Sequence, residues 1–222
     1  MPGASSVDRI TPKQLLANQT LGLDRRQLNM AELILTEFAL AGLPTRIAMA
    51  AVANAYGESK LDPNAVAGFL PWTGAGFSPR PGGENSVGLF QLNAARNAAG
   101  EGMSVRDRKN PYTHTARIIL VTKSVLPKVA VGRSAYTATG NFTRWVEDPA
   151  DPTPKAAERM LYCDRIFGSA MSRRDMAGMP EIQVTALAKV DRGVQMNVPL
   201  GWWGLAGVAG ALVVATVMVG RG

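Results

Sequence analysis

Apolar residues recur at helical spacing from Arg25 onward, and the pattern stops where Gly42 and Pro44 interrupt it. A residue every three or four positions lies on one face of a helix, so this spacing predicts a helix that packs by one side. The apolar positions of this face are Leu28, Ala31, Ile34, Leu35 and Phe38.

A second helical stretch begins at Pro44, a residue well suited to the first turn of a helix. Its apolar face runs through Ile47, Ala51 and Ala55, and the next position on that face is Glu58. Helical spacing therefore predicts that the Glu58 carboxyl faces the packed side of the helix. Such a carboxyl is either a solvated helix end or a proton donor held partly out of water.

The remaining pattern predicts a mainly α domain over residues 25–170. Residues 67–88 are dense in Gly and Pro and indicate a long loop with a small β-hairpin that leads into the apolar "VGLFQL". Further helices are expected at residues 113–126 and 154–167, the latter with Thr153 as N-cap and Pro154 at its first position. Residues 1–24 are interpreted as an N-terminal arm, and residues 171–197 as a connector.

Residues 198–220 contain no charged side chain, and this stretch is long enough to cross a bilayer, which needs about 20 apolar residues. Trp202 and Trp203 lie at one end, as interfacial aromatics do, and Arg221 follows the other. The segment predicts a transmembrane helix. A buried hydrophobic helix within an assembly is the alternative. Its small residues would permit close helix packing, and they are Gly201, Gly204, Gly207 and Gly210.

The composition of the chain indicates which partners it favours and which catalytic groups it lacks. A net charge of +7 favours anionic surroundings such as nucleic acid, acidic lipid or a bacterial envelope polymer. The single cysteine, Cys163, excludes an intramolecular disulfide, and the single histidine, His114, excludes the usual zinc clusters. We expect Cys163 to be a buried structural residue and His114 to lie at the surface or at a helix start. No metal or cofactor motif is present, so catalysis would fall to carboxylates.

Cleavage of a glycosidic bond requires an acid that keeps its proton near neutral pH, whereas an ordinary glutamate has a pKa of about 4.3. Desolvation raises that pKa, and so does the negative potential at the C-terminal end of a helix. The pattern places Glu58 where both effects act. Tyr56, Leu61 and Phe90 are the candidates to line the site.

Two motifs around Glu58 and Gln91 resemble those of a known enzyme family. "GESKLDPNAV" followed by "SVGLFQLN" is similar to the signature of the lysozyme-like superfamily, as in lytic transglycosylases and goose-type lysozymes. "SAYTATGNFTRW" resembles the later Ala-Tyr-Asn-Ala-Gly block of transglycosylases, although Thr137 replaces Asn and Thr139 intervenes before Gly140. The layout from Leu28 to Phe167 also resembles the phage tail lysozyme family, which has a Phe…Glu-x-Pro block late in its domain. The matching elements are Glu58, Ser59, Leu61, Asp62, Pro63, a Gly88-x-x-Gln91 strand and Tyr136.

The resemblance implies a role for each matching residue. Glu58 would be the general acid and then the base, Ser59 would orient Glu58 or an acetamido group, and Gln91 and Tyr136 would line the saccharide cleft. A second catalytic carboxylate is not evident. Asp62, Glu84 and Glu101 are the local possibilities, while Glu147-Asp148-Pro149 is expected to shape a helix boundary. A single acid would give a 1,6-anhydro product, and hydrolysis with a water positioned by Glu84 or Glu101 stays open.

Together these features predict a virion-associated enzyme that cleaves the MurNAc–GlcNAc bond of peptidoglycan, as a lytic transglycosylase or a muramidase. A phage particle would carry it to the host cell wall and inner membrane, which agrees with the lack of a signal peptide and with a membrane-inserting segment at 198–220. The expected partners are glycan strands, the lipid bilayer, other virion proteins and further copies of the chain, and we expect no cofactor or metal. The alternative is a non-catalytic structural virion protein, or a nucleic-acid-binding protein in which the region after Glu58 is a helix-turn-helix. Pro63 and the glycine-rich loop argue against that second helix.

Overall fold

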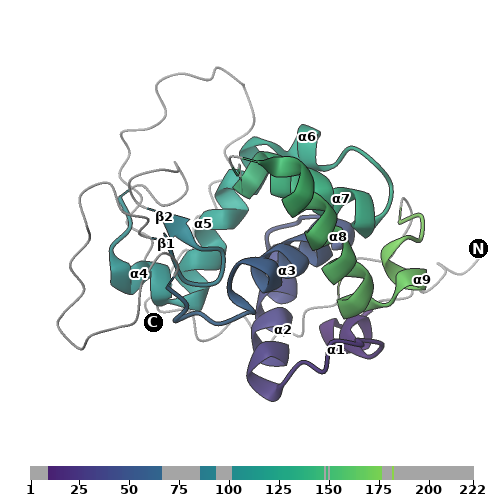
Figure 1. Cartoon of the computed structure of the whole chain (residues 1–222), viewed down its shortest axis with the longest axis horizontal. Helices are drawn as coiled ribbons and strands as arrows, with labels where there is room; N and C mark the ends of the chain where they lie inside the picture. Colours follow the sequence, from purple (N-terminus) through teal and green to yellow (C-terminus); the bar gives the residue numbers. More distant parts are fainter. Residues whose placement is uncertain are drawn as a thin grey trace, which may run out of the picture. The chain divides into compact units, whose positions relative to one another are not determined.

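A helix of small and apolar residues, α3 (Thr45–Ser59), forms the centre of the fold (Figure 1). The computed structural model describes residues 10–66, 86–93, 102–147, 149, 151–176 and 182. Within α3, residues 47–55 are buried on every side, and five of these nine residues are alanine. Because alanine side chains are short, neighbouring helices approach α3 closely.

Three helices pack directly against α3, namely α2 (Arg25–Leu40), α7 (Ala135–Phe142) and α8 (Pro152–Phe167). The predicted apolar face of α2 is confirmed, since Ala31, Ile34, Leu35 and Phe38 are all fully buried. The prediction of a mainly α fold is confirmed as well. The other helical segments are α1 (Pro12–Leu16), α4 (Val105–Lys109), α5 (Pro111–Ser124), α6 (Leu126–Val129), the π-helix η1 (Thr143–Glu147) and α9 (Ser169–Ser172).

The start of α2 shows how local sequence fixes a boundary. Asp24 accepts a hydrogen bond from the backbone N–H of Gln27, and the Gln27 side chain accepts one from the backbone N–H of Asp24. This reciprocal pair satisfies two backbone donors that the first turn of a helix leaves open. The predicted helix start at Arg25 is therefore confirmed.

A small antiparallel hairpin consists of β1 (Ser86–Val87) and β2 (Leu92–Asn93), with Val87 opposite Leu92. The prediction of a Gly88-x-x-Gln91 strand is wrong, because these four residues form the turn between β1 and β2. Gly88 has φ +84° and Gln91 has φ +49°, and both values lie in the left-handed region that a strand does not use. A Cβ at position 88 would also lie 2.0 Å from the Arg108 carbonyl oxygen, so only glycine fits there.

Two predicted helix boundaries are corrected. The helix expected at residues 154–167 begins at Pro152, so Asp151 rather than Thr153 takes the N-cap position. Proline suits position N1 at either site, and the sequence alone did not distinguish the two prolines. The helix expected at residues 113–126 is α5, which begins earlier because the Asn110 side chain accepts hydrogen bonds from the backbone N–H groups of the first turn. It ends at Ser124, and Leu126 starts α6.

The structure also shows where the single cysteine and the single histidine of the chain lie. Cys163 is fully buried, as predicted. The expectation of a helix-start position for His114 is confirmed, since it lies in the first turns of α5, whereas that of a surface position is wrong. The side chain is fully buried and stacks edge-on against Phe90 with ring centroids 5.6 Å apart. Burial lowers the pKa of His114 to about 4, so the imidazole is neutral at physiological pH.

The segments that flank the predicted domain contribute to its core where they are described. Leu15 and Leu16 of α1 are buried in the core, and so are Met176 and Ile182 beyond α9. Ile10 and Ile182 also form an isolated parallel bridge. The predicted membrane segment at 198–220 lies outside the described residues. In the part of the chain that the structure describes, no helix has the length and hydrophobicity to span a bilayer.

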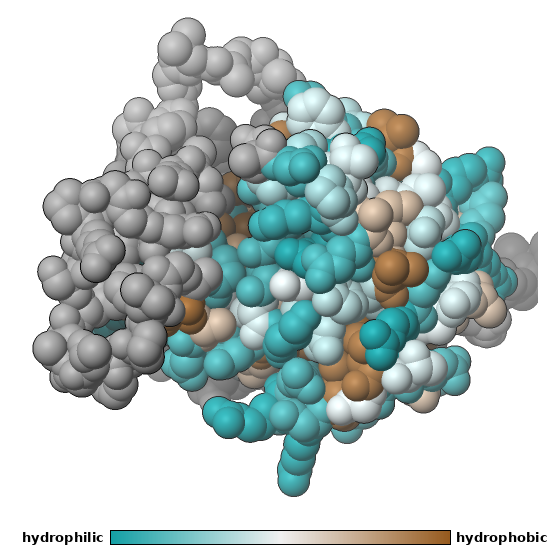
Figure 2. Space-filling view, in the orientation of Figure 1, coloured by the Kyte–Doolittle hydropathy of each residue, from teal (hydrophilic) through white to brown (hydrophobic). Residues whose placement is uncertain are grey.

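On the face shown in Figure 2, polar residues cover most of the described surface, and apolar residues form small separate groups. Single exposed apolar side chains are normal for a folded protein and mark no particular function.

Candidate active site

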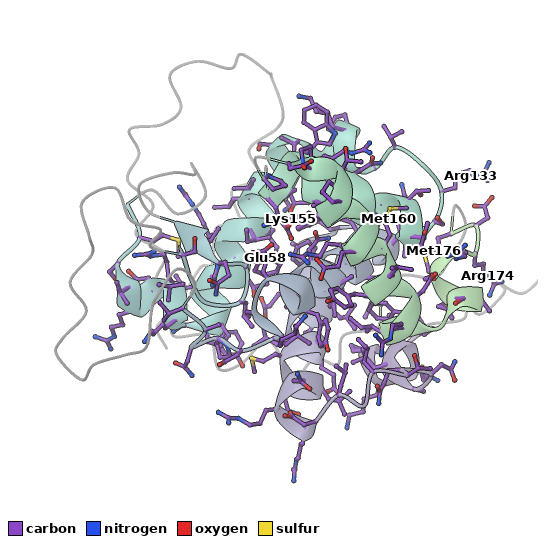
Figure 3. All side chains as sticks on the ribbon, in the orientation of Figure 1. Glu58, Arg133, Lys155, Met160, Arg174 and Met176 are labelled. Atoms are coloured by element: carbon purple, nitrogen blue, oxygen red, sulfur yellow. The ribbon has the colours of Figure 1, made fainter. Side chains whose placement is uncertain are left out.

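Glu58 lies on the last turn of α3, where the buried helix ends. The backbone N–H of Lys60 donates to the Tyr56 carbonyl, and Lys60 and Leu61 then adopt left-handed φ values of 57° and 61° that turn the chain away. The Glu58 side chain is 15% exposed, so it faces the packed side as the apolar stripe predicted. Figure 3 shows Glu58 next to Lys155, which comes from α8.

Two cations from α8 contact Glu58. The Nη2 atom of Arg159 lies 2.5 Å from Glu58 Oε1, and Lys155 Nζ lies 3.6 Å from the same oxygen. Arg159 is buried with only 4% of its side chain exposed, whereas 48% of the Lys155 side chain is exposed. Residues four apart on a helix share a face, which is why α8 presents both cations to the end of α3.

Arg159 reaches Glu58 because the residue before Glu58 is a glycine. A Cβ at Gly57 would lie 2.1 Å from Arg159 Nε, too close for any side chain. The guanidinium therefore lies directly against the backbone of α3. A glycine costs about 1 kcal/mol relative to alanine inside a helix, so a helical glycine at this position indicates a packing need.

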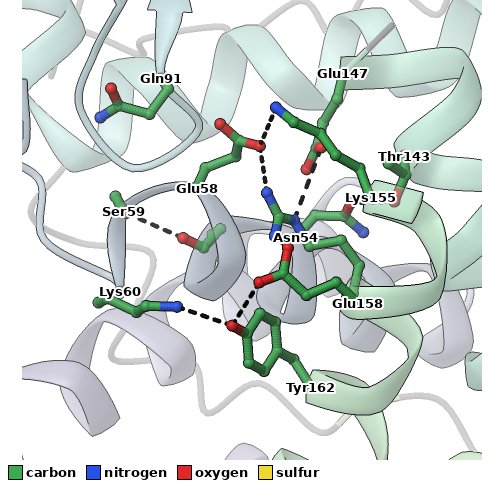
Figure 4. A network of polar contacts seen from close by, with 12 residues as sticks. Asn54, Glu58, Ser59, Lys60, Gln91, Thr143, Glu147, Lys155, Glu158 and Tyr162 are labelled. Atoms are coloured by element: carbon green, nitrogen blue, oxygen red, sulfur yellow. Dashed lines mark hydrogen bonds and ion pairs between the residues drawn. The ribbon is translucent and has the colours of Figure 1, made fainter. Parts of the chain in front are cut away.

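Arg159 also contacts two further carboxyl groups, those of Glu147 and Glu158, which Figure 4 shows in the same close view as Glu58. Its Nη1 atom donates to Glu158 Oε2 at 2.6 Å, and its Nε atom lies 4.0 Å from Glu147 Oε2. Glu158 is half exposed and accepts a further hydrogen bond, at 2.7 Å, from the Tyr162 hydroxyl. Arg159 is thus a common counter-charge for carboxyls from three segments of the chain.

Glu147 is the most buried carboxyl of the cluster, with 7% of its side chain exposed. It is the last residue of the π-helix η1, a geometry that often occurs at functional sites. Burial raises the pKa of Glu147 well above its ordinary value, and the negative charge of Glu58 raises it further, while Arg159 and Lys155 act in the opposite direction. Burial and the neighbouring charge of Glu58 therefore favour the protonated form of Glu147 more than in an exposed glutamate.

Neither oxygen of Glu147 has a hydrogen-bond donor among the described residues. An ionised carboxylate only accepts hydrogen bonds, so one of two neighbouring carboxyl groups can donate to the other only when it is protonated. With Glu147 protonated, Glu58 and Glu158 carry two negative charges, which balance the two positive charges of Arg159 and Lys155. The cluster is then electrically neutral, as a buried group of charges needs to be.

Ser59 connects the end of α3 to the hairpin. Its hydroxyl lies 2.8 Å from the Leu89 carbonyl oxygen and 3.0 Å from that of Ala55, and the side chain is buried. The hydroxyl proton is therefore used within the fold. Ser59 holds the turn of residues 88–91 against the helix that carries Glu58, in place of the direct contact with Glu58 or an acetamido group that the resemblance implied.

Gln91 completes the connection between the turn and the loop after α3. Its Nε2 atom donates to the Gly88 carbonyl at 2.9 Å and to the Ala65 carbonyl at 3.2 Å. The Oε1 atom is buried and has no donor among the described residues. Gln91 is therefore held between the turn and the loop after α3, with one acceptor that no described donor uses.

Three predicted site residues contact other parts of the fold. Phe90 is 4% exposed and packs against Phe142 in the core, so it is no wall of an open cleft. Tyr136 lies under the guanidinium of Arg173, 4.2 Å from its ring centroid, and no described polar contact joins it to Glu58. Tyr56 stacks edge-on with Tyr162 at 4.9 Å, and the Lys60 ammonium lies over both rings.

The second carboxylates proposed from the sequence, Glu84 and Glu101, lie outside the described residues. Asp62 accepts a hydrogen bond from the backbone N–H of Asn64 at 2.9 Å and so forms a turn. Sequence reasoning missed Glu147 and Arg159. Two signals were available: the glycine within α3, and the Phe…Glu-x-Pro block in which Glu147 was interpreted only as a helix boundary.

Within the described ranges, no three acidic, histidine or cysteine side chains gather in a way that would hold a metal ion. At the centre of the three carboxyls lies the Arg159 guanidinium. No protein-family model, curated protein or solved structure matches the chain.

Proposed function

We propose that the protein is a peptidoglycan-degrading enzyme that cleaves the MurNAc–GlcNAc bond with Glu58 as general acid and then base. The proposal joins the lysozyme-like resemblance to one observation: two partly or fully buried carboxyls, Glu58 and Glu147, share one guanidinium at the end of the central helix. Acid catalysis at neutral pH needs a carboxyl that retains a proton, and burial of Glu147 raises its pKa in that direction.

The reaction that forms an anhydro end needs no other reactant than the glycan and Glu58. Glu58 donates its proton to the glycosidic oxygen as the bond from that oxygen to C1 of MurNAc breaks. The 6-hydroxyl of the same sugar then bonds to C1, and its proton returns to Glu58, which leaves a 1,6-anhydro end. If water bonds to C1 instead, its proton returns to Glu58 and the product has an ordinary reducing end.

The two residues that fix the turn at 88–91 have supporting roles in this proposal. Ser59 holds the turn, to which Gln91 belongs, against the helix that carries Glu58. The Oε1 atom of Gln91 is buried without a donor among the described residues, so it would accept from a sugar hydroxyl or an acetamido N–H only when the turn exposes it. A site that hydrogen-bonds a sugar in this way would discriminate strongly against analogues that lack the donor.

The test uses purified cell-wall glycan and the full-length chain. Wild-type protein is expected to release muropeptides, and Glu58→Gln, which keeps the shape of the side chain but has no proton to donate, is expected to release none above background. Mass spectrometry of the products separates the two reactions, because an anhydro end is lighter by one water than a hydrolysed end. Equal release by the two proteins would end the assignment of Glu58.

The proposed setting is a phage particle that delivers the enzyme to the host envelope, with residues 198–220 inserting into the inner membrane. This part rests on the sequence, since a charge-free stretch of this length suits a bilayer. Flotation of the full-length chain with liposomes tests it. Val208→Lys places a charge near the middle of the segment and is expected to weaken flotation, and unchanged flotation would contradict the proposal.

The nucleic-acid alternative gains no support from the region after Glu58. Residues 60–66 form turns and an isolated bridge, so no recognition helix follows α3 there. Lys60, the basic residue next to Glu58, lies over the rings of Tyr56 and Tyr162.

A further inference from the structure

We propose that Glu58 and Glu147 share a single proton, and that Arg159 neutralises whichever of the two carboxyls is ionised. The proposal rests on the proposed function, which it deepens by naming Glu147 as a positioning residue that acts through Glu58. Nothing in the resemblance assigns Glu147 a part in the chemistry.

The geometry of Arg159 carries the inference. Its guanidinium donates to Glu58 through Nη2 at 2.5 Å and faces Glu147 through Nε at 4.0 Å. The Nε atom has no hydrogen-bond acceptor in the described structure. A buried guanidinium has five N–H donors in a fixed plane, so it can pair with one carboxylate and hold a free donor toward a second.

The charges around Glu147 favour one proton for the pair. The charged groups that face it are Glu58 from α3 and Arg159 and Lys155 from α8. Two carboxyls at close quarters in a buried site do not both ionise readily, and their protons are lost in two steps that belong to the pair. The one cation buried with them compensates a single negative charge.

The consequence for catalysis follows directly. While Glu58 is ion-paired with Arg159, the proton stays on Glu147. When a glycan covers Glu58, the proton passes to Glu58 and the negative charge moves to Glu147, where the Nε atom of Arg159 balances it. After bond cleavage the 6-hydroxyl or water returns a proton to Glu58, so the pair again holds one proton. Glu147 thus keeps the site ready for acid catalysis at neutral pH.

The first test does not depend on activity. An un-ionised carboxyl gives an infrared carbonyl band separate from that of carboxylates, and the full-length chain at pH 7 is expected to show one such band. Glu147→Gln is expected to abolish it. The matched control is Glu158→Gln, which removes an exposed carboxylate from the same guanidinium and is expected to leave the band in place. Glu58→Gln is expected to shift the titration of the band to lower pH, because the negative charge that raises the pKa of Glu147 is gone.

The second test is the pH profile of muropeptide release. Without a proton stored on Glu147, Glu58 has to take one from solvent while two cations face it. Glu147→Gln is therefore expected to lose at least about tenfold in rate at pH 7 and to recover activity at acid pH.

The outcomes separate the two proposals. A wild-type chain that shows no un-ionised carboxyl band at pH 7 overturns the shared proton, and so does an active Glu147→Gln with an unchanged pH profile. A wild-type chain that shows the band but degrades no glycan overturns the proposed function alone. If Glu147→Gln does not fold, the infrared band of the wild-type chain is titrated instead. A band that persists at pH 6 and above would support the shared proton, and a band already absent at pH 6 would refute it.

Discussion

Replacing Arg159 by methionine tests how far the fold depends on its buried guanidinium. Methionine keeps most of the length of the side chain and removes the charge. Glu58 would retain only the Lys155 ammonium at 3.6 Å, and the half-exposed Glu158 would be solvated instead. Removing one partner of a buried ion pair costs about 3–5 kcal/mol. Because Glu58 keeps 15% exposure and one cation, we expect the lower end, about 3 kcal/mol.

The measurement is urea unfolding of the full-length chain at pH 7, followed by circular dichroism. The matched control is Arg133→Met, which removes a cation whose ion pair with Asp175 is exposed on both sides, at 71% and 57%. An exposed pair contributes about 0–1 kcal/mol, so the control is expected to lose less than ~1 kcal/mol. Equal losses in the two variants would refute the view that Arg159 holds the cluster together.

Three further changes probe the same region. Gly57→Ala is expected to lower the melting temperature, although alanine favours helices, because the added Cβ would displace Arg159. Gly140→Ala serves as the control, because its Cβ would meet only the flexible end of a methionine side chain. A more stable Gly57→Ala would contradict this packing. Native Cys163 is expected to resist a thiol reagent that labels it in urea, since burial raises the pKa of the thiol to about 12, and rapid labelling of the native chain would count against that burial. In Glu147 the folded pKa lies above the unfolded one, so its stabilising contribution is complete below about pH 4.3 and is lost as the pH rises through the folded value. The free energy of unfolding is therefore expected to fall more between pH 5 and pH 8 in wild type than in Glu147→Gln. The extra fall is at most about 1.4 kcal/mol per pH unit, the value for one proton. Parallel pH dependences in the two proteins would contradict the raised pKa.

Much of the helical framework was predictable because its signals are local. The apolar face of α2 and its start at Arg25 follow from spacing and from a capping pair within four residues. The inward direction of Glu58 follows from the same helical period. The predicted start of α8 was wrong because two prolines near it are equally good signals for a first helical position. The strand predicted at 88–91 was wrong because the apolar residues there belong to a turn.

The candidate site was only partly predictable. Glu58 and Gln91 could be named from motif spacing, but Phe90 and Ser59 proved to be used by the fold itself, the first in the core and the second in a hydrogen bond to the turn. Whether a motif residue faces a ligand or the interior depends on what packs against it, and that information is not local in sequence. Arg159 shows the same point, because it lies 101 residues after its partner Glu58.

The amino-acid sequence by itself determined that the chain forms mainly helices, that Glu58 ends an apolar stripe, and that the chain has one cysteine and one histidine. Those conclusions depend on composition and on periods of a few residues. Only the tertiary structure decided that Glu147 and Arg159 meet Glu58, and that burial raises the pKa of Glu147. The physical reason is that burial and charge–charge interaction act through space, between segments whose separation along the chain says nothing about their distance.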